Sequence, residues 1–249
     1  MNGSLQDKTA LVTGGARRVG AAICRRLHAA GANVLVHCNR SQHDAQTLVH
    51  ELNGMRPGSA VLVQADLLEA GAPLALIQRT VSAYGGLDVL VNNASSFYAT
   101  PLGQIDMKVW DDLMGTNLRA PLFLSQASAT ELRRAQGCIV NIIDIHAERP
   151  LADHMVYTAA KGGLLALTRS LALELGPEVR VNGVSPGAIL WPDGPEWQNE
   201  DERQRILDRS VLKRTGEPDD IAGAVEFLAT APYVTGQIIA VDGGRSIVV

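Results

Sequence analysis

The sequence predicts an α/β protein built on one doubly wound parallel sheet of about seven strands, with helices on both faces. Two observations predict this class: short β-branched or leucine-rich runs recur along the chain, and longer stretches with helical periodicity separate them. The 249 residues contain no repeat, low-complexity tract or Pro/Ser-rich linker. We therefore interpret residues 1–249 as a single domain.

The expected strands begin after the first eight residues and cover residues 9–12, 33–37, 60–64, 88–91, 138–142, 180–185 and 237–241. Between the first two strands, Ile23, Leu27 and Ala30 recur at helical spacing, and Gly31 follows as a helix cap. A helix expected over residues 157–175 carries leucines all round its circumference. One face of this helix can pack on the sheet, and the other must be covered by another element or by a second copy of the protein. We favour the second copy and expect a homo-oligomer, in the form of a tetramer.

Composition and cysteine spacing exclude several classes of function. The net charge of −4 gives no electrostatic footprint for nucleic acid or anionic membranes. The longest apolar stretch, residues 162–175, is interrupted by charges and is shorter than the ~20 residues that span a bilayer. Cys24, Cys38 and Cys138 have neither metal-binding nor disulfide spacing. We expect a cytosolic protein without a targeting segment, and a small molecule as its partner.

A glycine-rich turn over residues 13–20, with the sequence TGGARRVG, directly follows the first strand and opens a helix. Such a turn lets the backbone approach a pyrophosphate, which lies against the positive end of the helix dipole. Glycine-rich turns also join strands to helices in many folds without binding anything. The position after the first strand favours a dinucleotide site on a Rossmann-type domain.

The end of the second strand, residues 37–41, indicates which dinucleotide binds. A site for NAD would have Asp or Glu at this strand end, to hold the ribose 2′-hydroxyl group. This chain instead has Arg40 and Ser41, which suit a 2′-phosphate. We therefore expect NADPH/NADP as the cofactor, with a solvated loop charge as the alternative interpretation of Arg40.

Tyr157 and Lys161 are four residues apart, so both lie on one face of the expected helix. The charge of the lysine would favour the phenolate and so lower the tyrosine pKa toward a value useful for proton donation. This spacing is common by chance. It gains weight from residues 92–94 after the fourth strand, from Asn117, and from residues 186–187 after the sixth strand.

With these motifs in place, the chain resembles the short-chain dehydrogenase/reductase family from residue 13 to residue 244. Arg18 occupies a position that is usually glycine in that family, and Asp144 occupies that of the catalytic serine, thirteen residues before the tyrosine. Both departures are similar to the pteridine reductases of the family. Residues 37–41 and 92–98 are similar to them as well.

The resemblance implies a role for each matching residue. Those at the cofactor would be Gly14, Arg18, Val19, His37, Asn39, Arg40, Ser41, Asp66, Leu67, Asn93, Ala94, Ser95, Tyr157, Lys161, Pro186 and Gly187, with Asp66 at the adenine. Those at the substrate would include Arg18, Ser95, Phe97, Asp144 and Tyr157, with Phe97 stacking a pteridine against the nicotinamide. The catalytic group would be Asp144, Tyr157, Lys161 and Asn117, with Asn117 holding a water relay to Lys161.

The chemistry of Asp144 supports a C=N substrate. A carboxylate would repel the alkoxide that develops when a ketone is reduced, where a hydrogen-bond donor is needed. Reduction of a C=N bond requires protonation of nitrogen, so a carboxyl group that shares a proton with Tyr157 is useful there. The alternative is that Asp144 only caps local backbone amides at a strand end.

Aromatic placement favours a flat substrate, because stacking is the natural use of aromatic faces. Aromatics make up only 4% of the chain, yet the segments expected around the cleft, including a substrate loop at residues 188–212, contain Phe97, Tyr98, Tyr157, Trp191 and Trp197. Core filling by Phe97 and loop packing by the two tryptophans are the alternatives. His146 and His154 match no strong metal pattern, so we expect them in a solvated loop and expect no metal site.

These observations favour an NADPH-dependent pteridine reductase, acting on dihydrobiopterin, dihydromonapterin or dihydrofolate. The alternative enzyme is a generic carbonyl or 3-oxoacyl reductase of the same family, in which Asp144 is a tolerated variant. A catalytically silent nucleotide-sensing protein on this fold also remains open.

Overall fold

The computed structural model describes residues 4–191 and 199–248. Its centre is a seven-stranded sheet in which every pair is parallel, with the strand order β3-β2-β1-β4-β5-β6-β7. The strands are β1 (Thr9–Val12), β2 (Asn33–Cys38), β3 (Ala60–Gln64), β4 (Val89–Asn92), β5 (Cys138–Ile142), β6 (Arg180–Pro186) and β7 (Ile238–Val241). The predicted fold class is confirmed, and each strand end lies within one residue of its expected position.

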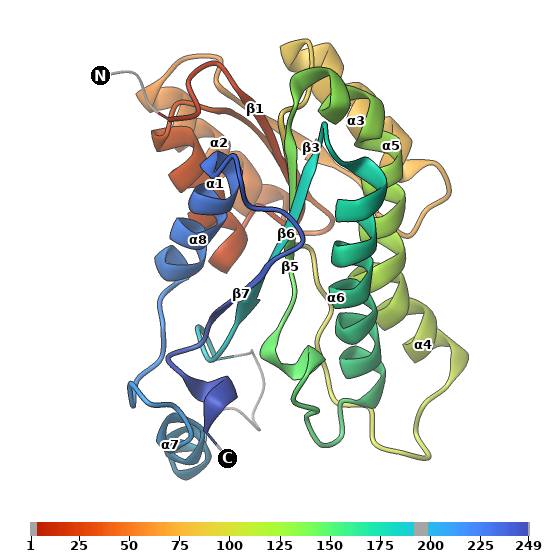
Figure 1. Cartoon of the computed structure of the whole chain (residues 1–249), viewed down its shortest axis with the longest axis vertical. Coiled ribbons are helices and arrows are strands. Elements are labelled where there is room, and N and C mark those ends of the chain that lie inside the picture. Colours follow the sequence, from red (N-terminus) through yellow and green to blue (C-terminus); the bar gives the residue numbers. More distant parts are fainter. Residues whose placement is uncertain (1–3, 192–198, 249) are drawn as a thin grey trace.

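Helices cover both faces of the sheet (Figure 1). One face carries α1 (Arg18–Ala29), α2 (Gln42–Met55) and α8 (Pro218–Thr230), and the other carries α3 (Ala72–Tyr84), α5 (Ala120–Ala135) and α6 (Met155–Leu175). A short helix α4 (Met107–Met114) continues through a π-helical segment, Gly115–Arg119, into α5. Part of the predicted substrate loop is helical, as α7 (Glu200–Asp208), while Trp197 lies outside the described residues.

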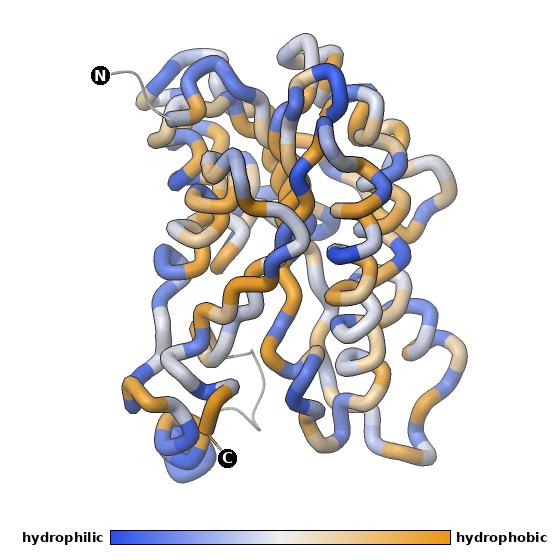
Figure 2. Tube along the Cα trace, viewed as in Figure 1, coloured by the Kyte–Doolittle hydropathy of each residue, from blue (hydrophilic) through white to orange (hydrophobic). Residues whose placement is uncertain are grey.

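The strands are buried on both sides, which explains why their sequences are continuous apolar runs rather than alternating ones. In β2, Val34 and Val36 pack with α1, α2 and α8, whereas Leu35 packs with α3 and α5. Figure 2 shows apolar segments along these central strands and also on the helices that flank them. Within the described residues, no helix combines the length and apolarity that a membrane crossing requires.

Helix α6 buries Leu164 and Leu165 against the sheet, but Leu173 is 85% exposed. The homo-oligomer inferred from this helix stays a prediction. Cys24, Cys38 and Cys138 are free and buried.

The strand order reverses between β1 and β4, and at such a switch point the loops leaving neighbouring strands diverge and open a crevice at their carboxyl ends. The candidate site is built at this edge.

Candidate active site

The glycine-rich turn has the geometry that the sequence predicts. Gly14 has a φ of +60°, which favours glycine, and a side chain at Gly20 would overlap the carbonyl oxygen of Gly14. Asn93 holds the turn, since its Nδ2 donates to the carbonyl oxygens of Thr13 (2.9 Å) and Gly14 (3.0 Å). The backbone can therefore approach a ligand closely at the start of α1.

His37 supports this turn from behind. Its Nδ1 accepts a hydrogen bond from the Gly14 amide (3.2 Å), so the neutral ring carries its proton on Nε2, which donates to the Ala65 carbonyl (3.1 Å). Burial lowers the pKa of His37, which keeps the ring neutral. His37, which was predicted to contact the cofactor, therefore holds the glycine-rich turn in place.

A cavity of about 1050 Å³ opens beside the turn. Among the described residues that line it are twelve of the predicted cofactor residues: Gly14, Arg18, Val19, His37, Asn39, Arg40, Ser41, Asp66, Leu67, Asn93, Ala94 and Ser95. Arg17 and Lys108 also line it. The sequence offered no signal for Lys108, because α4 is far from the turn along the chain. Of the other predicted cofactor residues, Pro186 and Gly187 lie at the end of β6, and Tyr157 and Lys161 on α6.

Arg18 lies in a left-handed backbone conformation, with a φ of 54°. This conformation explains why glycine is usual at the position. Its Nη2 donates to the carbonyl oxygens of Leu190 (3.2 Å) and Trp191 (2.9 Å). Arg18 therefore connects the turn to the start of the predicted substrate loop, a contact that sequence reasoning missed.

Asp144 uses its two carboxylate oxygens differently. Oδ2 accepts a hydrogen bond from the Tyr157 hydroxyl (2.8 Å), and Oδ1 accepts one from the backbone amide of His146 (2.8 Å). Both interpretations of Asp144 thus describe real contacts: the carboxylate caps a short 3₁₀ turn, Ile145–Ala147, and also contacts the phenol.

The pKa of Tyr157 shifts in the opposite direction from the one expected. Burial raises it well above its ordinary value, and the neighbouring Asp144 carboxylate raises it further. Burial lowers the pKa of Lys161 from its ordinary value to about 8. Its Nζ donates to the Ile142 carbonyl (2.9 Å) and lies 5.6 Å from the centre of the Tyr157 ring. The phenol is therefore held protonated.

The side chain of Asn117 is fully buried and holds the loop after β4. Its Nδ2 donates to the carbonyls of Ser96 and Leu113, both at 2.9 Å, and its Oδ1 accepts from the Ser95 hydroxyl at 2.7 Å. The two bonds from Nδ2 fix the orientation of the side chain. Its Oδ1 can then hold the Ser95 hydroxyl in place. The predicted water relay to Lys161 stays a prediction.

Phe97 is half-buried and contacts two other rings. His154 stacks on it with centroids 4.7 Å apart, and Tyr157 meets it edge-on with centroids 4.8 Å apart. The expectation of a solvated His154 was wrong, since this side chain is only 8% exposed. The ring contact with Phe97 could not be seen from sequence spacing, because 57 residues separate the two positions.

A chain of buried polar groups ties α6 to the sheet below the site. Asn92 Nδ2 donates to Asn141 Oδ1 (2.8 Å), Asn141 Nδ2 donates to the Thr168 hydroxyl (2.9 Å), and that hydroxyl donates to the Leu164 carbonyl (2.7 Å). The Asn141 and Thr168 side chains are fully buried. This network joins β4 and β5 to the helix that carries Tyr157 and Lys161.

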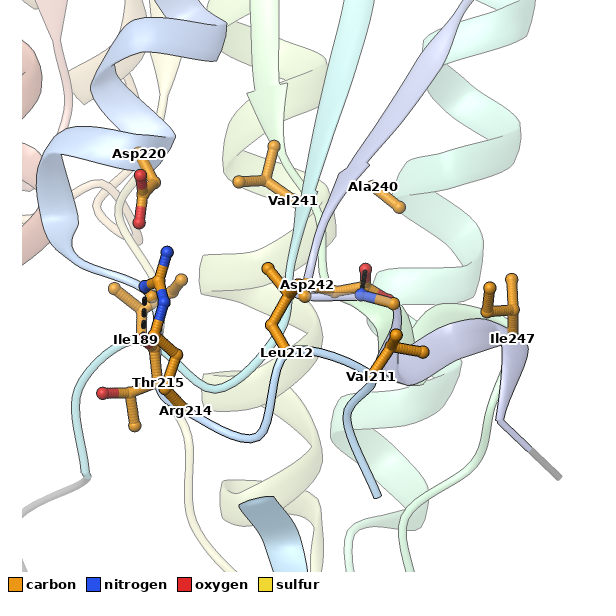
Figure 3. Close-up of a pocket in the computed structure, with 13 residues that line it drawn as sticks. Ile189, Val211, Leu212, Arg214, Thr215, Asp220, Ala240, Val241, Asp242 and Ile247 are labelled. Atoms are coloured by element: carbon orange, nitrogen blue, oxygen red, sulfur yellow. Dashed lines mark hydrogen bonds between the residues drawn. The ribbon is translucent and has the colours of Figure 1, made fainter. Parts of the chain in front are cut away.

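A second cavity, of about 470 Å³, lies beyond the ends of β6 and β7 (Figure 3). Its walls are largely apolar, with Ile189, Leu212 and Val241 among them, and Arg214 and Asp220 lie at one end. None of the predicted catalytic residues is among the described residues that line it. The described part of the chain contains no cluster of three or more side chains that could hold a metal ion.

The fold and the turn define a nucleotide-binding α/β protein, and comparison with known proteins gives its family. A family model described as enoyl-(acyl carrier protein) reductase matches residues 14–246. Pteridine reductase 1 from Leishmania tarentolae is 40% identical over 280 aligned residues, which cover 96% of each chain. The chain belongs to the short-chain dehydrogenase/reductase family and is an oxidoreductase.

Relatives with other activities are similar at nearly the same level. L-xylulose reductase from Bos taurus is 35% identical over 246 residues, covering 96% of this chain and 97% of the relative. 3-Oxoacyl-(acyl-carrier-protein) reductase FabG from Staphylococcus aureus is 35% identical over 241 residues, covering 95% and 97%. A blue fluorescent protein from a metagenomic library, solved in complex with NADPH, has a TM-score of 0.90 and 37% identity and covers 97% of this chain and 99% of its own. The predicted family is confirmed.

Proposed function

We propose that the protein is an NADPH-dependent pteridine reductase that reduces a C=N bond of a pterin or folate ring. The observation that carries this proposal is the 2.8 Å hydrogen bond from the Tyr157 hydroxyl to Asp144. A carboxylate at that place is unfavourable beside a developing alkoxide. It is suited to a reaction in which a ring nitrogen must receive a proton.

The cavity beside the turn fits NADPH. Its glycine backbone leaves room for a pyrophosphate at the start of α1, and Arg17, Arg18, Arg40 and Lys108 supply positive charge around it. Arg40 and Ser41 would hold the 2′-phosphate at the end of β2. When bound, NADPH supplies the hydride that is transferred to the pterin carbon.

The chain's own residues then deliver the proton. Tyr157, whose hydroxyl is hydrogen-bonded to Asp144, donates its proton to the substrate nitrogen next to the reduced carbon. The phenolate that forms is adjacent to the Lys161 ammonium, which stabilises it until solvent returns a proton through Asp144. Asn117 supports the step by holding Ser95 at the loop after β4.

Phe97 and the residues around it favour a planar ring. Its half-buried ring would stack on a pteridine, and Arg18 and Trp191, which are hydrogen-bonded to each other, would contact the substrate beside it. Dihydrobiopterin, dihydromonapterin and dihydrofolate all meet these requirements. A homotetramer in the cytosol is part of the same proposal.

A second candidate is a carbonyl or 3-oxoacyl reductase, which the similarity to L-xylulose reductase and FabG favours. Oxidation of NADPH followed with dihydrobiopterin, with an acetoacetyl thioester and with no substrate separates the candidates. Turnover with dihydrobiopterin at least tenfold above the thioester supports the pteridine reductase. The reverse preference contradicts it, and no turnover with either identifies a nucleotide-binding protein without this chemistry.

A further inference from the structure

His154 stands at the N-cap of α6 but makes no capping hydrogen bond with its side chain. Ser, Thr, Asp and Asn are the residues that favour helix initiation at this position. A histidine that does not cap is therefore unexplained by the needs of the helix. Its side chain is only 8% exposed, so it is not a solvated loop residue either.

The ring of His154 instead contacts Phe97, the residue that we propose for stacking on the substrate. It lies parallel to the Phe97 ring, at an interplanar angle of 17° and a centroid distance of 4.7 Å. Phe97 in turn meets Tyr157 edge-on, at 79° and 4.8 Å. Phe97 thus contacts both the phenol and the imidazole, and a rotation of its ring would disturb both contacts.

The backbone around the stack is tied together as well. Thr100 and His154 form an isolated parallel β-bridge, and the Thr100 amide donates to the Asp153 carbonyl. His154 Nδ1 is 2.8 Å from the Ala152 carbonyl, so the imidazole is oriented from its own turn. The loop that carries Phe97 and the turn that carries His154 are therefore one unit, packed beside Tyr157.

We propose that His154 is a positioning residue, whose ring fixes Phe97 so that a planar substrate meets the Phe97 face and the Tyr157 hydroxyl in one geometry. This inference rests on the proposed function and adds to it a residue that sets the preference for flat rings. The competing role is local: His154 would only orient the turn through the Ala152 carbonyl.

Two variants separate these roles. His154→Phe keeps an aromatic ring for Phe97 and removes the N–H that faces Ala152, whose carbonyl lies in an exposed turn and can bond water. His154→Asn removes the ring, keeps an N–H donor, and introduces a residue that favours the N-cap, so the fold is supported. Aromatic pairs contribute amounts equivalent to roughly two- to twelve-fold in binding.

We expect His154→Asn to raise the KM for dihydrobiopterin by about two- to twelve-fold. His154→Phe should leave this KM within about twofold, and the Kd for NADPH should change in neither variant. Equal KM values in the two variants, or a larger rise in His154→Phe, would overturn the inference.

Crystal structures of the two variants give a readout that does not depend on the substrate. The Phe97 ring should keep its orientation in His154→Phe and change it in His154→Asn. An unmoved Phe97 ring in His154→Asn overturns the inference whatever the substrate. Absence of dihydrobiopterin turnover by the unsubstituted enzyme contradicts the proposed function, while the ring orientation still decides the role of His154.

Discussion

The two halves of the site are built from different parts of the chain. The cofactor half is defined mainly by backbone: a turn that needs glycine, and the ends of β1, β2 and β4. The half that we propose for the substrate is defined by side chains, with Asp144, Tyr157 and Phe97 fixed by contacts to one another. The first half can be shared by a whole family, whereas single substitutions in the second can change the reaction.

The largest effect is expected from Asp144→Ser, which changes the substrate half alone. Pterin reduction should fall by ~10² to 10⁴, because a carboxyl that shares a proton with Tyr157 is replaced by a hydroxyl. Activity on a small activated ketone should rise, because a donor now faces the alkoxide. The ratio of the two activities is the quantity to measure, since it cancels any loss of folded enzyme.

Asp144→Asn is the matched control, because its amide oxygen can still accept from the His146 amide. An unchanged activity ratio in Asp144→Ser would make the generic carbonyl reductase the better hypothesis.

Tyr157→Phe should keep the ring packing against Phe97 while it removes the proton. We expect kcat to fall by ~10² to 10⁴ with the Kd for NADPH unchanged. Steady-state kinetics and a cofactor titration measure the two quantities. A kcat within a few-fold of the unsubstituted enzyme would show that another group is the acid.

The pH dependence of the free energy of unfolding tests whether the pKa of the buried Lys161 is lowered. Its pKa is about 8 in the folded protein, against 10.5 for an ordinary lysine, so the unfolded chain binds more protons between these values. The contribution of Lys161 to the free energy of unfolding should therefore rise with pH across this window, by roughly 3 kcal/mol in total. Denaturant titrations of the cofactor-free protein and of Lys161→Met, from pH 7 to pH 10, give it as a difference. A difference that stays flat with pH would contradict the lowered pKa.

Arg40→Ala tests the cofactor half. Removal of a charge-assisted contact to the 2′-phosphate should raise the KM for NADPH about tenfold to a hundredfold. The KM for NADH should change little, which makes NADH the internal control. Equal losses for both cofactors would contradict the assignment of Arg40.

The smallest effect concerns Arg18, which belongs to both halves. Arg18→Gly and Arg18→Ala both remove the bonds to Leu190 and Trp191, but only glycine relieves the left-handed conformation. Arg18→Gly should therefore be more stable than Arg18→Ala by about 1 kcal/mol. Both variants should show the same change in the KM for substrate. Equal stability, measured in denaturant, would show that the conformation carries no strain.

The contrast between a half defined by backbone and a half defined by side chains also explains which features could be predicted from the sequence. The strands were predictable because parallel strands buried on both faces are short apolar runs, and the turn because glycine, strand and helix follow in a fixed order. The pairing of Tyr157 with Asp144 was implied by the resemblance to the pteridine reductases. The direction of the Tyr157 pKa shift was not, because it depends on how deeply the phenol is buried and on its hydrogen bond to the Asp144 carboxylate.

Contacts between separate loops could not be predicted from the sequence either. The stack of His154 on Phe97 and the bonds from Arg18 to residues 190–191 join segments whose relative placement only the folded chain determines. Sequence spacing carries no information on such distances.

The hydrogen-bonded chain from Asn92 through Asn141 to Thr168 has a consequence for helix register. Apolar contacts such as those of Leu164 would tolerate a small slide of α6 along the sheet, because dispersion has little directional preference. A hydrogen bond between two fully buried groups forms at only one axial position, and a slide would leave both unsatisfied. The buried amides therefore fix the position of α6 along the sheet. They set how far Tyr157 and Lys161 extend past the strand ends, and so the depth at which a proton can be delivered.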